Sequence, residues 1–304
     1  MSLAATGARE AIKTPYHENG LFDLPSFDHL LETQVAGGAN GVVVGGTTGE
    51  GQLMSWDEHV MLIAHAVNGW GAHLAVVGNT GSNSTREALH ASEQGFNVGM
   101  DAALHINPYY GKTSVAGLRS HFTHCLDVGP SIIYNVPART AQDIPESLVR
   151  ELAAHPNLIG IKECTGNERI ARTVAAGIPC WSGNDDEAHD AVHDANAVGT
   201  ISVASNIAPA ATRALLERRD PDLVRRLQPL WAWLFCEPNP IAVDTALMMM
   251  GLVKPVFRLP YVPLSRDKRE EGKRILDEIR DLLIPFEGEI KILEDEDFVV
   301  LPKY

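Results

Sequence analysis

Short apolar runs recur along the first two thirds of the chain, and amphipathic stretches of helical period lie between most of them. Apolar runs of this length predict strands that are buried on both faces of a parallel sheet. The predicted strands cover 11–15, 41–45, 74–78, 102–107, 131–135, 158–162, 178–182 and 199–203. Eight βα units in series favour a closed (β/α)8 TIM barrel over an open doubly wound sheet, and no GxGxxG follows the first strand.

Two sequence signals mark the beginnings of helices. Ser55 has Glu58 three positions later, and Ser84 has Glu87 three positions later. This spacing predicts a capping box, in which the serine and the acid each accept a hydrogen bond from a backbone N–H at the helix start.

The pattern changes after about Pro209. The segments 224–235, 239–251 and 267–283 predict helices with no strand between them. We therefore expect a catalytic barrel over 1–220 and a C-terminal helical domain with an acidic tail over 221–304. Trp231, Trp233 and Phe235 on the first of these helices predict packing onto the barrel or across a subunit contact. The tail over 286–304 has no predicted place.

Composition excludes several classes of function. The net charge of −14 argues against nucleic acid and anionic membrane as partners. No apolar run approaches the roughly 20 residues that span a bilayer. The four cysteines show no CxxC and no metal-ligand spacing, so we expect no metal site and a reducing compartment. The first ten residues show no signal or transit pattern, so we expect a targeting segment to be absent or removed.

Lys162 closes the apolar run 158–161, which reads as a buried strand. An ammonium group there is costly to desolvate, so we expect its pKa to be lowered. A lysine with a lowered pKa is a nucleophile toward carbonyl groups, with which it forms a Schiff base. The alternative is a lysine just beyond the strand, paired with Glu163 or with solvent.

Other polar residues follow the predicted strands at the same end, where barrel enzymes build their sites. A lysine, tyrosine and threonine hydroxyls and one arginine are expected to converge there. The segments are GGTTGE at 45–50, NPYY at 107–110, YNVPART at 134–140, KE at 162–163 and IS at 201–202.

Each segment also has a simpler interpretation. The glycines of 45–49 suit a tight turn or a carboxylate approached by backbone N–H groups, whereas a phosphate loop would need a Lys-Ser/Thr ending. Tyr109 and Tyr110 point in opposite directions if their segment is extended, so at most one faces the site. Arg139 is either a surface ion-pair partner or, after a rigid proline, a planar fork for a carboxylate.

The segments 45–50, 134–140 and 160–163 (GIKE) resemble the signatures of the dihydrodipicolinate synthase family. That family belongs to the pyruvate-dependent class I aldolase superfamily, together with the sialic acid lyases. The resemblance runs from about Ala11 to about Leu264. NPYYGKTS at 107–114, WSGNDDE at 181–187 and FRLPYVP at 257–263 resemble the plant and green-algal branch. The segments before Ile12 and after Pro285 do not resemble the family's usual ends.

The resemblance implies a lyase that condenses pyruvate with L-aspartate 4-semialdehyde in lysine biosynthesis through diaminopimelate. Lys162 would form the imine with pyruvate, and Tyr134 would donate and accept protons beside it. Thr48 and Tyr110 would relay protons, with Tyr110 reaching in from a neighbouring subunit. The resemblance further implies that Thr47 and Thr48 hold the pyruvate carboxylate, Arg139 the semialdehyde carboxylate, and the Ile201 carbonyl the bound pyruvate. No metal or organic cofactor is implied.

A second set of residues resembles the family's L-lysine feedback site at a dimer interface. The set comprises Gln52, Trp56, His59, Asn83, Glu87 and Tyr109. Glu87 would pair with the ammonium group, and Trp56 would cover the aliphatic stem. In the simpler interpretation, Glu87 only completes the capping box and Trp56 only packs.

Two other functions are weighed against this lyase. One is another pyruvate aldolase, acting on a sugar acid or a longer keto acid, which Arg139 and the lysine-site residues disfavour. The other is a non-catalytic amino-acid-binding barrel, which would require a broken set of site residues. Since the Tyr110 relay and the lysine site need a neighbour, we expect a homo-oligomer, a dimer of dimers, and the plant-like resemblance implies the chloroplast stroma.

Overall fold

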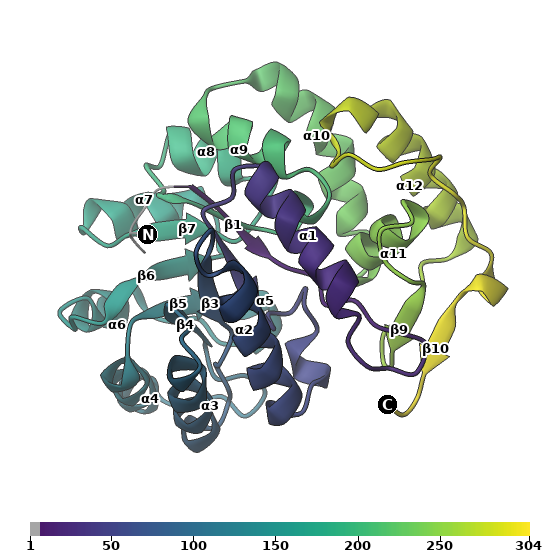
Figure 1. Ribbon diagram of the computed structural model, residues 1–304. Helices are drawn as coiled ribbons and strands as arrows, with labels where there is room; N and C mark the ends of the chain where they lie inside the picture. Colours follow the sequence, from purple (N-terminus) through teal and green to yellow (C-terminus); the bar gives the residue numbers. More distant parts are fainter. Residues whose placement is uncertain (1–6) are drawn as a thin grey trace.

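The computed structural model describes residues 7–304. Within this range eight parallel strands pair in chain order and close into a barrel, which confirms the predicted fold class (Figure 1). The strands are β1 Gly7–Ala11, β2 Gly41–Val44, β3 Ala75–Gly78, β4 Ala102–Ile106, β5 Ser131–Asn135, β6 Leu158–Glu163, β7 Cys180–Ser182 and β8 Gly199–Ser202. β8 pairs with β1, so the barrel leaves no free edge.

The first strand begins earlier than the sequence pattern predicted. β1 spans Gly7–Ala11, whereas the apolar pattern placed it at 11–15. Arg9 and Glu10 break the apolar pattern, although both are buried in the barrel wall. The segment 12–15 is buried irregular chain just beyond the strand, and a Cβ added to Gly49 would lie 2.7 Å from the Ile12 carbonyl oxygen. The misplaced segment therefore packs against the loop after β2.

Helices cover the outside of the barrel. They are α1 Leu24–Ala36, α2 Trp56–Trp70, α3 Thr85–Asn97, α4 Val115–Val128, α6 Glu146–Leu152, α7 Asn167–Ala175, α8 Ala188–His193 and α9 Pro209–Glu217. Ser55 and Glu58 form the predicted capping box at the start of α2. At α3 only half of the predicted box forms: Ser84 Oγ accepts from the Glu87 N–H, but the Glu87 carboxylate bonds to Arg86 instead.

The C-terminal part contains the helices α10 Pro221–Leu234, α11 Ile241–Met249 and α12 Arg266–Glu278. The prediction of helices without strands is wrong, because β9 Val256–Arg258 lies between α11 and α12 and pairs in parallel with β10 Val299–Leu301. Strands of three residues are too short to carry a period-two pattern. The unplaced tail thus returns along β9, and its last residue, Tyr304, lies with its ring 4.0 Å from the Arg258 guanidinium.

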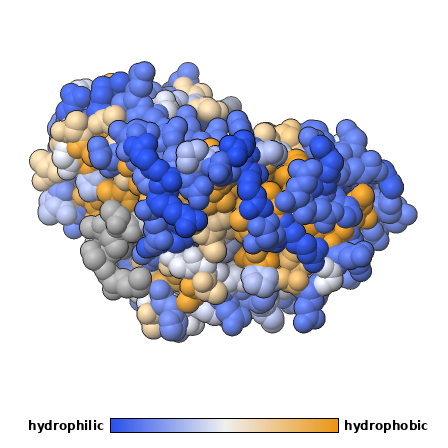
Figure 2. Space-filling view, turned by 90° about the horizontal axis from the view of Figure 1, so that it is seen from above, coloured by the Kyte–Doolittle hydropathy of each residue, from blue (hydrophilic) through white to orange (hydrophobic). Residues whose placement is uncertain are grey.

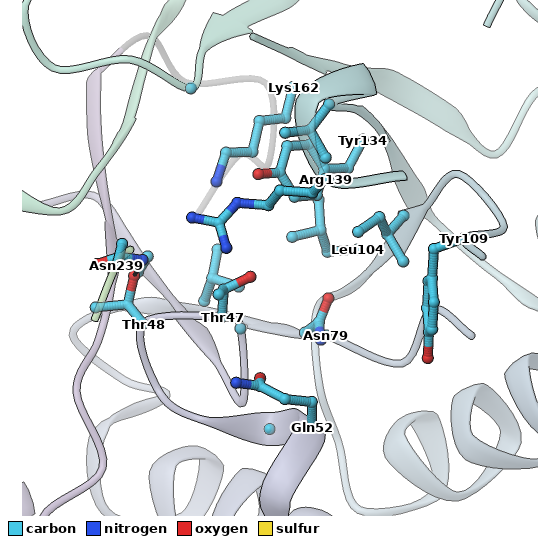
Figure 3. Close-up of a pocket in the computed structure, with 18 of the residues that line it drawn as sticks. Thr47, Thr48, Gln52, Asn79, Leu104, Tyr109, Tyr134, Arg139, Lys162 and Asn239 are labelled. Carbon is cyan, nitrogen blue, oxygen red and sulfur yellow. Dashed lines mark hydrogen bonds between the residues drawn. The ribbon is translucent and has the colours of Figure 1, made fainter. Parts of the chain in front are cut away.

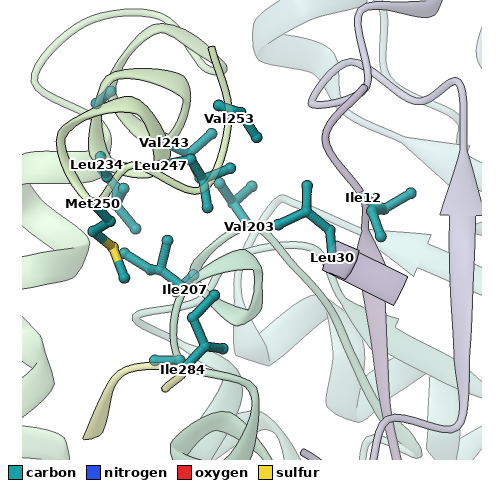
Figure 4. Packing of buried hydrophobic residues seen from close by; sticks show 14 of the residues in the cluster. Ile12, Leu30, Val203, Ile207, Leu234, Val243, Leu247, Met250, Val253 and Ile284 are labelled. Carbon is teal, nitrogen blue, oxygen red and sulfur yellow. The ribbon is translucent and has the colours of Figure 1, made fainter. Parts of the chain in front are cut away.

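One apolar cluster joins the barrel to the C-terminal helices. Figure 4 shows Ile12 and Leu30 from the barrel side facing Val203, with Leu247 of α11 beyond it. Trp231 and Trp233 are buried in the same cluster, as their predicted packing role requires. The division of the chain at residue 220 stays a prediction.

The surface seen from above is mostly hydrophilic, with apolar residues in small patches between the polar ones (Figure 2). In the described part of the chain, no helix combines the length and apolarity needed to cross a membrane.

Candidate active site

A cavity of about 550 Å³ opens at the carboxyl ends of the barrel strands. Its wall combines residues from the strand ends with two from the segment between α10 and α11 (Figure 3). Ten of the residues predicted from sequence line it: Thr47, Thr48, Gln52, Trp56, His59, Glu87, Tyr109, Tyr134, Arg139 and Lys162. Segments from widely separated parts of the chain therefore meet in one space.

Lys162 lies within β6, with its side chain pointing into the cavity. The pairing of β5 with β6 shifts register between Ser131 and Ile132, and Trp181 packs closely on Gly160. Both features lie just before Lys162 along the sheet. The Lys162 side chain is 7 % exposed, and its Nζ lies 4.4 Å from the Tyr134 ring centre. Burial lowers its pKa, and the charge of Arg139 lowers it further.

The alternative pairing of Lys162 with Glu163 does not form. Glu163 turns to the other side of β6, where its carboxylate accepts hydrogen bonds from Asn135 Nδ2 at 3.1 Å and from the Thr165 N–H at 3.0 Å. Among residues 7–304, no carboxylate lies within ion-pairing distance of Lys162 Nζ. The amine thus faces the cavity without a counter-ion, in the environment that favours its neutral, nucleophilic form.

Tyr134 is the penultimate residue of β5 and pairs with Lys162 in the sheet register. Its hydroxyl lies 4.0 Å from the Cys164 Sγ. Burial, followed by the neighbouring Cys164, raises the pKa of Tyr134 well above its ordinary range, so its proton stays on the hydroxyl. A protonated phenol next to an amine can exchange a proton with a group bound to that amine.

The loop after β2 presents two threonines. Gly45 takes a φ of +67°, and a Cβ there would lie 2.0 Å from the His59 ring, so glycine is required at this turn. Thr48 is buried, and its Oγ1 accepts a hydrogen bond of 3.1 Å from Asn239 Nδ2. Thr47 is half-buried beside it. The loop therefore presents hydroxyl groups to the cavity.

Arg139 lies in α5 Pro137–Thr140, a single turn that follows β5. Arg139 is exposed, and in the described chain no acidic side chain comes within ion-pairing distance of it, so it has no ion-pair partner within this chain. Figure 3 shows its guanidinium pointing into the same space as Lys162 Nζ and the Tyr134 hydroxyl. An unpaired guanidinium in this place can receive an anionic group.

Three predicted residues lie outside the cavity wall. Ile201 is fully buried in β8, and Val203 lines the cavity in its place. Tyr110 is 93 % exposed with a φ of +69° and does not line the cavity, so of the two adjacent tyrosines only Tyr109 reaches it within one copy. Asn83 lies beside Tyr109 and donates from Nδ2 to its carbonyl oxygen at 3.4 Å.

The remaining second-site residues line the far end of the same cavity. The rings of Trp56 and His59 stack with their centres 5.4 Å apart on α2. His59 is buried, which lowers its pKa to about 4 and keeps the ring neutral at physiological pH. Gln52 donates to the Tyr261 hydroxyl at 2.6 Å. The Glu87 carboxylate does not cap α3: it pairs with Arg86, and Glu87 lines the cavity.

Sequence reasoning missed several lining residues. Cys164 stands two positions after Lys162, and the period of a strand places both on one face. Phe235 and Asn239 enter from the segment between α10 and α11. The prolines on either side of Asn239 signal a fixed loop, but only the packed fold brings that loop to the barrel mouth.

Histidine, cysteine and acidic side chains do not gather into a metal site anywhere in residues 7–304: no group of three or more that could hold an ion is present there. The cavity residues that carry polar atoms are mainly hydroxyls, amides, one amine and one guanidinium. These groups suit a carbonyl compound that bears carboxylates.

The barrel and the site at its mouth define a lyase of the (β/α)8 class. The chain belongs to the dihydrodipicolinate synthetase family, whose model matches residues 4–279. It is 57% identical over 295 residues to the chloroplastic 4-hydroxy-tetrahydrodipicolinate synthase of Nicotiana tabacum, covering 97% of this chain and 82% of that protein. Since so little of the chain is left outside this match, the tail after Pro285 lies at least partly within it, contrary to expectation.

Two solved structures share the fold. One is dihydrodipicolinate synthase from Acinetobacter baumannii complexed with pyruvate, with a TM-score of 0.86 and 35% identity over 90% of this chain and 98% of that one. The other is the enzyme from Cyanidioschyzon merolae with lysine bound, with a TM-score of 0.86 and 26% identity over 91% of this chain and 99% of that one.

Proposed function

We propose that this protein condenses pyruvate with L-aspartate 4-semialdehyde to 4-hydroxy-tetrahydrodipicolinate, the first committed step of lysine biosynthesis through diaminopimelate. The observation that carries the proposal is Lys162, a desolvated amine without a counter-ion that faces Tyr134 in the cavity. Family membership and the 4-hydroxy-tetrahydrodipicolinate synthase relatives support the choice of substrates.

The reaction begins at the amine. Lys162 Nζ attacks the pyruvate ketone, water leaves, and an imine remains; loss of a C3 proton then gives an enamine. The enamine carbon adds to the semialdehyde carbonyl. The amino group of the semialdehyde finally attacks the imine carbon, closes the six-membered ring and releases Lys162. The lysine itself takes up the electron pair during these steps, so we expect turnover without a metal or organic cofactor.

Tyr134 is assigned as the proton donor and acceptor, because its hydroxyl keeps its proton and lies beside the imine position. Acid–base help of this kind contributes about 10²–10⁴-fold to the rate. Thr47 and Thr48 hold the pyruvate carboxylate. The contact of the Ile201 carbonyl with the bound pyruvate stays a prediction, because Ile201 lies outside the cavity wall. Thr48 also passes protons on toward Tyr110 of a neighbouring copy.

Arg139 selects the acceptor. Its unpaired guanidinium suits the carboxylate of the semialdehyde, whereas a sugar-acid aldolase would need hydroxyl-binding groups there. A non-catalytic barrel is disfavoured because Lys162, Tyr134, Thr48 and Arg139 share one cavity.

L-Lysine is proposed as a feedback inhibitor that binds at Gln52, Trp56, His59, Asn83, Glu87 and Tyr109. The lysine-bound relative supports this assignment. We further propose a homo-oligomer, a dimer of dimers, because Tyr110 lies outside its own cavity. The chloroplastic relatives support the plastid stroma as its location.

The test is reduction with borohydride in the presence of pyruvate, followed by intact-mass analysis and peptide mapping. The expected product is a reduced pyruvyl adduct on Lys162 and none in Lys162→Met. Turnover of aspartate semialdehyde then separates this lyase from another pyruvate aldolase. A folded wild-type protein without an adduct would leave the amino-acid-binding barrel as the better interpretation.

A further inference from the structure

Three ionisable side chains from distant parts of the chain meet beneath the threonine loop. Lys13 follows β1, Glu50 ends the loop after β2, and Asp244 lies in the first turn of α11. Each is at most 1% exposed. Lys13 Nζ contacts the Glu50 carboxylate and lies 2.9 Å from Asp244 Oδ2. We call these residues the buried triad.

Stability alone gives no reason to keep such a group. Desolvating an ion pair costs about as much as the attraction returns, and well-packed apolar residues of the same volume are often equally stabilising or better. The buried triad holds two acids and one base, and it lies outside the wall of the cavity. Ionisable groups in this place are better explained by a role in holding the shape of the threonine loop than by a role in stability.

The triad contacts a strained turn. Glu50 takes a φ of +57°, in the left-handed region that non-glycine residues rarely adopt. The turn also packs closely, since a Cβ on Gly51 would lie 1.9 Å from the Gly45 carbonyl oxygen. Thr48 stands two positions before Glu50, so the contact of the Glu50 carboxylate with Lys13 holds the backbone that carries the threonine hydroxyls.

The C-terminal part of the chain reaches the same loop a second time. Asn239, at 4% exposure, donates from Nδ2 to Thr48 Oγ1 at 3.1 Å. Asn239 and Asp244 are five positions apart at the start of α11. The start of α11 therefore reaches the loop in two ways. Asn239 contacts Thr48 directly (Figure 3). Asp244 contacts Lys13, which in turn contacts Glu50.

We propose that Lys13, Glu50 and Asp244 are positioning residues: they fix the turn at Glu50 and, through it, place the Thr47 and Thr48 hydroxyls for the condensation. The start of α11 thereby becomes part of the catalytic apparatus, although the triad does not touch the substrate. This inference rests on the proposed function.

Steady-state kinetics of Asp244→Asn test the role of the triad. The change keeps the size of the side chain and replaces the carboxyl group that Lys13 Nζ contacts with an amide. We expect kcat to fall about 10²-fold, as for a misplacement of about 1 Å at a reacting group. The borohydride-trapped adduct on Lys162 should still form, because the amine itself is untouched. Asp222→Asn, an exposed acid on α10 paired with Arg225, is the matched control and should keep the wild-type kcat.

A double-mutant cycle with Thr48→Val separates positioning from general destabilisation. If the triad acts through Thr48, Asp244→Asn should change kcat less than twofold in the Thr48→Val background, because the positioned group is already missing. Equal losses of kcat in both backgrounds would overturn the proposal.

A second variant covers the case in which Asp244→Asn does not fold. The triple change Lys13→Met, Glu50→Gln and Asp244→Leu leaves no buried charge unpaired, so it should fold with a melting temperature near that of the wild type. A wild-type kcat in this folded variant would overturn the proposal, and a lowered kcat with an intact adduct would support it. Failure of the wild type itself to turn over would instead refute the proposed function on which the inference rests.

Discussion

The chemistry of the site depends on how Lys162 is surrounded. Its amine is buried in a strand, stands over an aromatic ring and has only a guanidinium as its charged neighbour in the cavity. Two buried acids, Asp185 and Glu10, favour the charged form of Lys162, but they act from beyond ion-pairing distance. Desolvation therefore dominates, and the pKa of Lys162 is lowered.

This environment predicts a stability change in Lys162→Met that depends on pH. The folded chain holds the Lys162 proton less tightly than the unfolded chain, whose lysine pKa is about 10.4. Lys162 therefore lowers the free energy of unfolding most below its folded pKa, and this penalty disappears as the pH rises toward the unfolded value. Lys162→Met should raise the melting temperature more at pH 7 than at pH 10, as measured by calorimetry.

Lys291→Met is the control for this comparison, because Lys291 is exposed on the C-terminal tail. It should change the melting temperature little at either pH. An equal gain for Lys162→Met at both pH values would contradict a lowered pKa.

Among the elements, α2 and α3 bring their first turns to the far end of the cavity. The stacked Trp56 and His59 form a flat, uncharged wall on α2, and Glu87 stands opposite on α3. The missing half of the α3 capping box leaves the Glu87 carboxylate paired with Arg86, an exposed partner whose place the ammonium group of a ligand can take. These elements together offer an apolar surface and one acid, which suits an amino acid with a charged side-chain end.

Glu87→Gln should therefore weaken inhibition by L-lysine. Loss of a charge-assisted contact with an ammonium group costs about 1.5–3 kcal/mol, so the half-inhibiting concentration should rise about 10- to 100-fold. The rate without L-lysine should stay the same. Initial rates over a range of L-lysine concentrations measure both quantities.

Glu93→Gln, an exposed acid two turns along α3, should leave the half-inhibiting concentration unchanged. Inhibition as strong in Glu87→Gln as in the wild type would remove Glu87 from the lysine site.

The positions of the apolar strands could be predicted from the sequence, whereas those of β1 and β9 could not. β6 and its neighbours lie within about two residues of their predicted positions, because both faces of these strands are buried. β1 carries Arg9 and Glu10 into the barrel wall, and β9 is only three residues long. Neither feature leaves a hydrophobic period in the sequence.

For the whole molecule, the exposed Tyr110 is the observation on which the proposal of a second copy rests. Its side chain is 93 % exposed on a turn with a left-handed φ, and it does not line its own cavity. In a two-fold symmetric dimer, a residue that leaves one subunit can enter the equivalent site of the other.

Subunit mixing tests this exchange. Tyr110→Phe and Lys162→Met should each be nearly inactive alone. In a mixed dimer, one site combines an intact Lys162 with an intact Tyr110 from the other subunit, so random mixing should restore about a quarter of the wild-type rate. Equal activity before and after co-refolding would mean that Tyr110 does not act across subunits.

Mixing Tyr134→Phe with Lys162→Met is the matched control. Both residues belong to the same cavity of one subunit, but a mixed dimer leaves each site with one defective residue. This mixture should stay inactive, so recovery confined to the Tyr110 pair would identify Tyr110 as the residue that crosses the interface.

The sequence by itself determined the barrel and most of its strands, because buried parallel strands are local signals. The strand-end motifs, together with the family resemblance, named ten residues that line the cavity. Only the tertiary structure decided where β1 begins, that Glu87 does not cap α3, and that Asn239 and Asp244 reach the threonine loop. The start of β1 and the approach of Asn239 and Asp244 depend on contacts between residues some 200 positions apart, such as Lys13 with Asp244, whereas Glu87 pairs with its neighbour Arg86 instead of capping. The hydrophobic pattern of a single segment does not encode contacts with residues so far away in the sequence.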